Sequence, residues 1–96
     1  MIFEWDDRKN QENLSKHYLS FEEAQEAFFD EKRIIISDDT HSTDDEKRFF
    51  CVGNTGFDIA TVRFTIRNNN IRIFGAGYWR KGKKRYEENS HLHTGR

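Results

Sequence analysis

The first residues of the chain show two successive periodicities. Within residues 2–5, Phe3 and Trp5 are separated by two with the polar Glu4 between them, and this spacing predicts a short strand because successive strand residues point to opposite faces. Asp6 or Asp7 is then a suitable N-cap, since a short carboxylate accepts from the free amides of a first helical turn. The pattern predicts a helix from this cap to about Tyr18.

A second helix is predicted from a capping box. Ser20 precedes Glu23 by three residues, so the Ser20 hydroxyl is expected to accept from the Glu23 amide while the Glu23 carboxylate returns to the Ser20 amide. Phe21, Ala24 and Phe28 then lie on one face of a helix with 3.6 residues per turn. This face is the predicted core-facing side of the second helix.

The middle of the chain has the pattern of strands. A β-branched run precedes a polar, acidic loop at residues 37–45, and longer apolar runs follow with Gly and Asn residues between them. Residues 53–56 and 68–70 tolerate the positive φ that tight hairpins require. Residues 34–36 are therefore expected to form a strand before the loop, and an antiparallel meander is expected after it, with predicted strands at residues 48–52, 57–67 and 71–77.

Alternation within the longest strand assigns its two faces. Ala60, Val62, Phe64 and Ile66 share one side, which we expect to face the core. The other side is expected to carry guanidinium groups among aromatic rings, a combination suited to single-stranded nucleic acid. A solvated face, or one that pairs with the acidic helices, is the alternative. The residues predicted on this outer face are Arg48, Arg63, Arg67 and Arg72 with Phe50 and Phe74.

Turn length suggests a register for these strands. A two-residue turn at residues 69–70 sets Arg67 opposite Arg72, and the preceding hairpin sets Arg48 opposite Thr61. Two opposed arginines destabilise a bare sheet, so this register favours an anion on the outer face.

The last segment is basic. A C-terminal helix is expected from about Trp79 to Asn89, with an internal Gly82 that weakens it. The chain of 96 residues suits a single domain, predicted at residues 1–89, with a disordered tail at residues 90–96. The expected class is α+β: an antiparallel sheet with two N-terminal helices and a basic C-terminal helix.

Charge is divided along the chain although the net charge is only -1. Residues 1–46 contain 5 Lys and Arg against 14 Asp and Glu, whereas residues 47–96 contain 11 against 3. Such asymmetry suits a polyanion or an acidic partner, or the two halves neutralise each other in the folded state. A lone cysteine, Cys51, and no apolar stretch of membrane length or signal peptide indicate a cytoplasmic protein.

Several motifs together resemble the BrnT-type toxins of bacterial type II toxin–antitoxin pairs. They are Phe3-Glu4-Trp5-Asp6, Lys9, Asn13, Lys16-His17, Ser20-Phe21-Glu22-Glu23-Ala24, Glu46-Lys47-Arg48-Phe49, Gly53, Ile71-Arg72-Ile73 and Arg85-Tyr86-Glu87-Glu88. The resemblance implies a RelE-like fold and a ribonuclease that arrests translation and growth. It also implies a ribbon-helix-helix antitoxin of BrnA type, through which operator DNA is bound, and no cofactor.

One position departs from that family pattern. Typical members have an arginine where this chain has Gly77, and Arg80 is a candidate substitute. The departure leaves open a catalytically weak or silent homologue that binds the antitoxin as a co-repressor. A general binding module for single-stranded RNA is a further alternative.

RNA cleavage without a metal requires a base, an acid and a cation for the phosphorane. Histidine titrates near pH 6.5 and arginine binds phosphate in bidentate fashion, so both are favoured; at a helix end, however, His17 also suits a role in capping the dipole. The histidines lack converging metal-ligand spacing, and no metal is expected. The predicted catalytic residues are Lys16, His17, Glu46, Arg48, Arg80 and Tyr86. The predicted RNA-binding residues are Arg63, Arg67, Arg72, Lys81, Lys83 and Lys84.

Overall fold

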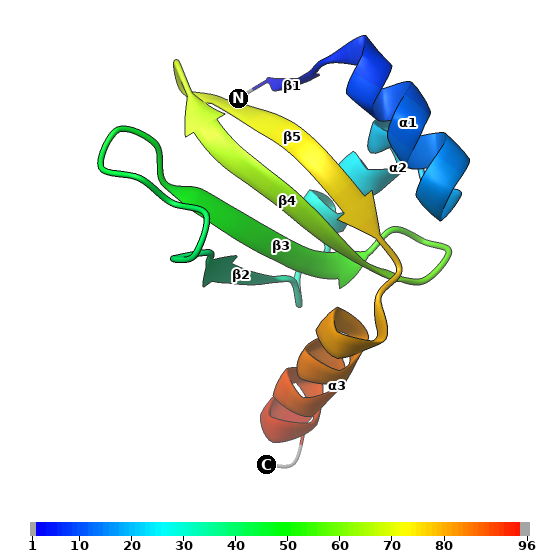
Figure 1. Ribbon diagram of the computed structural model, residues 1–96. Helices are drawn as coiled ribbons and strands as arrows, with labels where there is room; N and C mark the ends of the chain where they lie inside the picture. Colours follow the sequence, from blue (N-terminus) through cyan, green and yellow to red (C-terminus); the bar gives the residue numbers. More distant parts are fainter. Residues whose placement is uncertain (1, 95–96) are drawn as a thin grey trace.

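A computed structural model describes residues 2–94, with side chains described to Asn89. Three α-helices, one 3-10 helix (η1) and a five-stranded sheet make up this part of the chain (Figure 1). Among the described helices, none has the length and apolar content needed to cross a bilayer. The elements are β1 Phe3–Trp5, α1 Asp7–His17, α2 Phe21–Ala24, η1 Gln25–Phe29, β2 Ile34–Ser37, β3 Arg48–Asn54, β4 Ile59–Arg67, β5 Asn70–Gly77 and α3 Arg80–Thr94.

The sheet is mixed, in the order β1-β5-β4-β3-β2. The predicted meander of β3, β4 and β5 is antiparallel, and β2 also pairs antiparallel with β3. In contrast, β1 pairs with β5 in parallel, with Phe3 opposite Ile71 and Trp5 opposite Ile73. The α+β class is confirmed, and the prediction of a purely antiparallel sheet is wrong. Turn residues in the sequence identify only strands that are joined by hairpins. The pairing of β1 with β5 joins residues far apart in the chain, so no turn residues indicate it.

The turn between β4 and β5 lies one residue earlier than predicted. Asn68 and Asn69 have φ of 53° and 66°, the left-handed values of a two-residue hairpin turn. Arg72 is therefore opposite Thr65, and Arg67 is opposite Asn70. The predicted pairing of Arg67 with Arg72 is wrong, so the expected repulsion between them does not arise.

The register of β3 with β4 also differs from the prediction. Arg48 is opposite Thr65 instead of Thr61, because β4 starts later and Phe57 lies in the turn, 80% exposed. The β3–β4 pairing is displaced by four residues, and the β4–β5 pairing by two residues as far as Phe64 opposite Ile73. Over these pairs the side chains keep their predicted faces, since faces alternate with a period of two. From Arg63 opposite Gly75 onward, an irregularity in the register reduces the displacement to one residue.

The core lies between one face of the sheet and the α2–η1 segment, which is behind the sheet in Figure 1. The Ser20 hydroxyl accepts from the Glu23 amide as predicted, but the Glu23 carboxylate accepts from Tyr78 and not from Ser20. A Cβ at Gly53 would overlap the Ala27 carbonyl, so glycine permits the helical segment to approach β3 closely. The fully buried residues of this layer include Leu19, Phe21, Ala24, Ala27, Cys51, Val62 and Ala76.

Helix α1 lies along the β1–β5 edge and is fixed there by a buried amide (Figure 1). Asn13 Nδ2 donates to the carbonyls of Leu19 at 2.8 Å and Ala76 at 2.9 Å, and Asn13 Oδ1 accepts from the Ala76 amide at 3.1 Å. Asp6 caps the start of α1, and Tyr18, with φ of 56°, ends it. These contacts fix which face of α1 is turned toward the sheet.

Helix α3 packs on the opposite face of the sheet from α2, over β3 and β4. A Cβ at Gly82 would overlap the Thr61 hydroxyl oxygen, so this glycine brings the helix backbone onto the sheet. The prediction that Gly82 only weakens the helix therefore overlooked a packing role. The helix begins one residue later than predicted and continues to Thr94, into the segment predicted as a tail; residues 95 and 96 lie outside the described residues.

Candidate functional site

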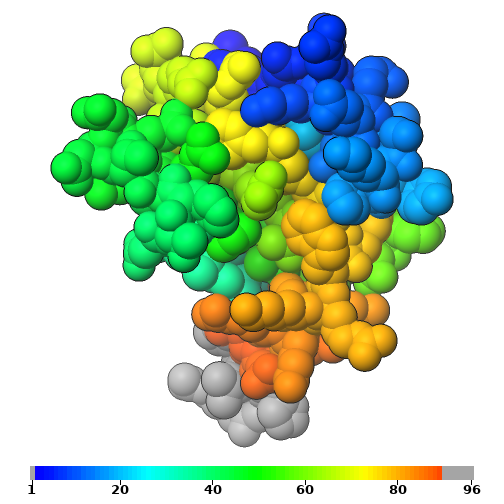
Figure 2. Space-filling view, in the orientation of Figure 1, coloured from blue at the N-terminus to red at the C-terminus, as the bar shows by residue number. Residues whose placement is uncertain are grey.

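A pocket of about 370 Å³ opens on the face of the sheet that the α2–η1 segment leaves uncovered. Figure 2 shows this face between α1 in blue and the loop before β3 in green, with the start of α3 below it. Cationic side chains from α1 and from the sheet lie close together there, around aromatic rings. The pocket is lined by Lys9, Glu12, Asn13, Lys16 and His17 of α1, by Arg48, Arg63, Phe74 and Gly75 of the sheet, and by Trp79.

Helical periodicity places the α1 residues at this pocket. Lys9, Glu12 and Lys16 are spaced by three and four residues, which puts them on one face of an α-helix. Asn13 lies beside them and binds β5, so the same face is held against the sheet edge. His17 belongs to the last turn of α1 and lies at the end of the helix beside these residues.

Arg48 is held in the pocket by a carboxylate and an aromatic ring. Glu46 accepts from the Arg48 guanidinium at 3.0 and 3.1 Å, and the guanidinium lies 4.3 Å from the centre of the Phe74 ring. Glu46 also binds Arg67 at 2.7 Å. The hydrogen bonds from Arg67 and then from Arg48 lower the pKa of Glu46, so its carboxylate is ionised at neutral pH.

A β-bulge opposite Arg63 shapes the floor of the pocket. The register between β4 and β5 shifts after Arg63, leaving Phe74 as an extra residue between Ile73 and Gly75. The Arg63 guanidinium lies across Gly75, where an added Cβ would be 3.0 Å from one of its nitrogens. Among the described residues, Arg63 has no carboxylate within salt-bridge distance, so its charge is available to an anion.

Trp79 forms the wall of the pocket nearest α3. Its ring lies edge-on to the His17 ring, with the centroids 5.4 Å apart. A Cβ at Gly77 would overlap the Trp79 ring. The backbone at Gly77 is therefore covered by the Trp79 ring.

Of the six predicted catalytic residues, Lys16, His17 and Arg48 line this pocket, and Glu46 holds Arg48 from outside it. Arg80 is exposed at the start of α3 and does not line the pocket. Tyr86 is also outside it: its hydroxyl donates to Asp30 at 2.6 Å.

The predicted RNA-binding residues are also divided. Arg63 lines the pocket, and Lys81 lines a second pocket beneath α3. Three others bind carboxylates: Arg67 binds Glu46, Arg72 binds Glu4 at 2.9 Å and Lys83 binds Asp58 at 3.1 Å. Lys84 is exposed and lines neither pocket.

These ion pairs bear on the divided charge of the sequence. Glu4 and Glu46, from the acidic half, bind arginines of the basic half. The halves thus neutralise each other in part, as the alternative interpretation proposed. The uncompensated cations of the pocket come from both halves, since Lys9 and Lys16 lie in the acidic one.

Sequence reasoning missed Lys9, Glu12 and Trp79 as pocket residues. A signal for the first two was present, because polar residues recur at the i, i+3 and i+7 positions of α1 where a packed helix would have apolar ones. Trp79 had no such signal. Among the described residues, no three His, Cys, Asp or Glu side chains gather as metal ligands would.

Comparison with known proteins gives this site a family context. Curated protein sequences contain no match to the chain. The profile of the family described as "Ribonuclease toxin, BrnT, of type II toxin-antitoxin system" matches residues 5–83, which include the whole pocket. The chain therefore belongs to the BrnT family of ribonuclease toxins, and as the toxin of a type II system it has an antitoxin as its partner.

Proposed function

We propose that the chain is a metal-independent endoribonuclease whose active site is the pocket between α1 and the open sheet face. The observation that carries the proposal is the meeting of Lys9, Lys16, His17, Arg48 and Arg63 around one hollow of about 370 Å³. Phosphate requires cations and a nucleobase requires a flat apolar surface. The rings of Phe74 and Trp79 at the pocket supply that surface.

In this proposal the two arginines hold the scissile phosphate. Arg48 is oriented by Glu46 and by the face of Phe74, and Arg63 is free of carboxylates among the described residues. A planar guanidinium binds two phosphate oxygens at once and stabilises the charge of the pentacoordinate phosphorane. Holding Arg48 in place before RNA binds reduces the reorganisation that the reaction requires.

His17 and Lys16 are proposed for the proton transfers. His17 accepts the proton of the ribose 2′-hydroxyl as its oxygen attacks phosphorus, since histidine is the side chain that most often serves as a general base. The bond from phosphorus to the 5′-oxygen breaks, and the Lys16 ammonium donates a proton to that oxygen. The products are a 2′,3′-cyclic phosphate and a 5′-hydroxyl end, with no metal in the step.

The experiment follows cleavage of a labelled RNA in EDTA by the purified protein and its variants. His17→Ala is expected to lower the rate by about 100-fold or more, as loss of a proton-transfer group does, and Arg48→Gln is expected to lower it comparably. Lys32→Gln, an exposed cation outside the pocket, is the control and should retain the rate. Intact RNA with folded wild-type protein contradicts the proposal and favours the silent, antitoxin-binding homologue.

Family membership also supports a finer proposal about the partner. We propose a ribbon-helix-helix antitoxin of BrnA type, so that the complex binds operator DNA through the antitoxin. Co-expression with the neighbouring reading frame, followed by purification of the complex and an operator gel shift, tests it. A partner without the ribbon-helix-helix pattern would contradict this assignment and leave the toxin family unchanged.

A further inference from the structure

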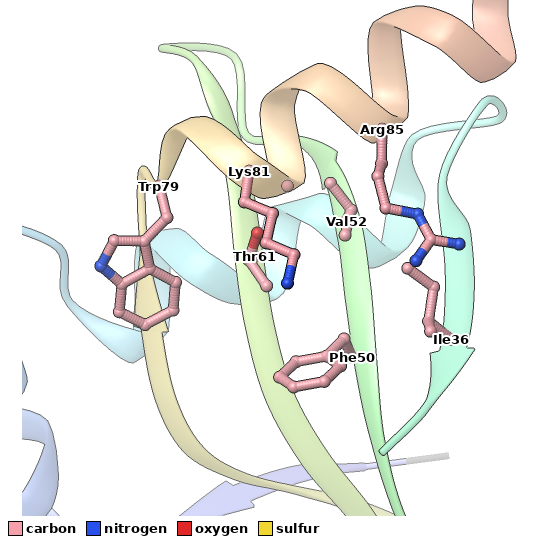
Figure 3. A pocket seen from close by; sticks show the side chains of 8 residues that line it. Ile36, Phe50, Val52, Thr61, Trp79, Lys81 and Arg85 are labelled. Carbon is pink, nitrogen blue, oxygen red and sulfur yellow. The ribbon is translucent and has the colours of Figure 1, made fainter. Parts of the chain in front are cut away.

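A second pocket, of about 410 Å³, lies between α3 and the sheet. Figure 3 shows Trp79, Lys81 and Arg85 reaching toward the sheet from the α3 side, with Val52 between Lys81 and Arg85 and with Phe50 and Ile36 below them. Its volume falls in the range of small-ligand sites, roughly 300 to 1,000 Å³. It is therefore large enough to hold a group from outside the chain.

The lining of this pocket combines an apolar floor with cations at its mouth. Phe50 is half-buried in the floor, whereas Lys81 and Arg85 are exposed on α3. Among the described residues, neither cation has a carboxylate within salt-bridge distance, in contrast with Lys83, which binds Asp58. A flat apolar surface with two free cations beside it suits a nucleobase and the phosphate attached to it.

The second pocket adjoins the proposed active site. Trp79 lines both pockets, and its ring faces His17 on the active-site side. Phe50 of the second pocket is directly opposite Arg63 of the first in the β3–β4 register. An RNA strand with its scissile phosphate at Arg63 therefore has its next nucleotide within reach of Phe50 and Trp79.

We propose that the pocket beneath α3 is an RNA subsite for a nucleotide next to the scissile phosphate. Its base lies against Phe50 and Trp79, and its own phosphate contacts Lys81 and Arg85. This inference rests on the proposed ribonuclease function and adds the path that the RNA strand takes beyond the scissile phosphate. RNA is the occupant because the free charges at the mouth of the pocket are cationic and because the pocket is continuous with the proposed active site.

The test measures binding of a 2′-O-methyl RNA oligonucleotide, which lacks the attacking hydroxyl, by fluorescence anisotropy at several salt concentrations. The variant is Lys81→Gln with Arg85→Gln, and the matched control is Lys32→Gln with Arg8→Gln, two exposed cations outside both pockets. The subsite predicts a Kd raised about tenfold at 0.1 M salt and a log–log salt slope reduced by about 0.7, the value for one phosphate contact on a single strand, since both cations contact the same phosphate.

A second variant examines the floor of the pocket. Phe50→Leu, checked for folding by circular dichroism, is expected to raise the Kd about tenfold without changing the salt slope, since stacking is lost and the charges remain. If this variant does not fold, the exposed Lys81 and Arg85 pair still decides the question.

The outcomes separate this inference from the proposed function. If Lys81→Gln with Arg85→Gln binds RNA like its control while His17→Ala still abolishes cleavage, the subsite is refuted and the ribonuclease stands. The same conclusion follows if that variant loses antitoxin binding but keeps its affinity for RNA, because the pocket would then be a contact site for the antitoxin. If wild-type protein binds no RNA at all, both proposals are overturned.

Discussion

Replacing Asn13 with alanine tests how α1 is attached to the sheet. The Asn13 amide is buried and makes three hydrogen bonds, to the Leu19 carbonyl and to both the carbonyl and the amide of Ala76. Leu19 and Ala76 are themselves fully buried. Asn13→Ala thus removes three bonds at once and leaves three backbone groups without their partner.

The expected magnitude follows from these three bonds. Each contributes about 1 kcal/mol net, and a buried group left unsatisfied raises the loss to about 1 to 3 kcal/mol. We expect the free energy of unfolding to fall by about 3 kcal/mol or more. For a chain of 96 residues the whole stability is about 5 to 14 kcal/mol, so this change is a large part of it, and the Tm should fall by about 12 to 24 °C.

Urea unfolding followed by circular dichroism measures the loss. Gln11→Ala removes an exposed amide from the same helix and should change stability by no more than about 0.5 kcal/mol. Asn13→Asp keeps the acceptor for the Ala76 amide but sets a carboxylate against two carbonyls. Burial and those carbonyls should raise the pKa of this acid in the folded state, so the variant should lose stability as the pH rises above about 4.

A loss of less than about 1 kcal/mol in Asn13→Ala, with an m-value that matches the wild type, would refute the role of these three hydrogen bonds in attaching α1. That result would mean that water replaces the amide and that α1 is held by other contacts. A pH-independent loss in Asn13→Asp would refute the assignment of the amide nitrogen as the donor to the two carbonyls.

Three further predictions concern other parts of the fold. Gly82→Ala should destabilise the protein in urea although alanine favours an isolated helix by about 1 kcal/mol, because the added Cβ overlaps Thr61; stabilisation would refute the close packing. The Cys51 thiol, buried and with its pKa raised to about 12 by that burial, should react with a thiol reagent only at the rate of unfolding, and a fast native reaction would contradict its burial. Hydrogen bonds lower the pKa of Glu4 and of Glu46, the largest contributions coming from Asn70 for Glu4 and from Arg67 for Glu46. The free energy of unfolding should therefore decrease as the pH falls below about 4.5, and Glu46→Gln should make that decrease smaller.

Local sequence patterns determined the elements of this protein and the faces of its strands. Caps at Asp6 and Ser20 marked where helices begin, and hairpin residues marked the meander. Alternation placed Arg48 and Arg63 on the face opposite the core. These predictions succeeded because caps, turns and period-two alternation depend on residues close together in the chain.

The composition of the candidate site was predicted in part. The sequence predicts Lys16, His17, Arg48 and Arg63 as site residues, and all four line one pocket. Their number and charge signalled an anion site, but sequence could not show which cations stay free. Arg67 and Arg72 are bound by Glu46 and Glu4, residues far from them in the chain.

Tertiary structure decided the features that depend on distant residues. Pairing of β1 with β5 and the contact of Gly82 with Thr61 each join segments that no local pattern relates. The position of α3 follows from that last contact and leaves the second pocket between helix and sheet. Short-range stereochemistry therefore specified the elements from the sequence, whereas packing between distant segments decided which charges meet.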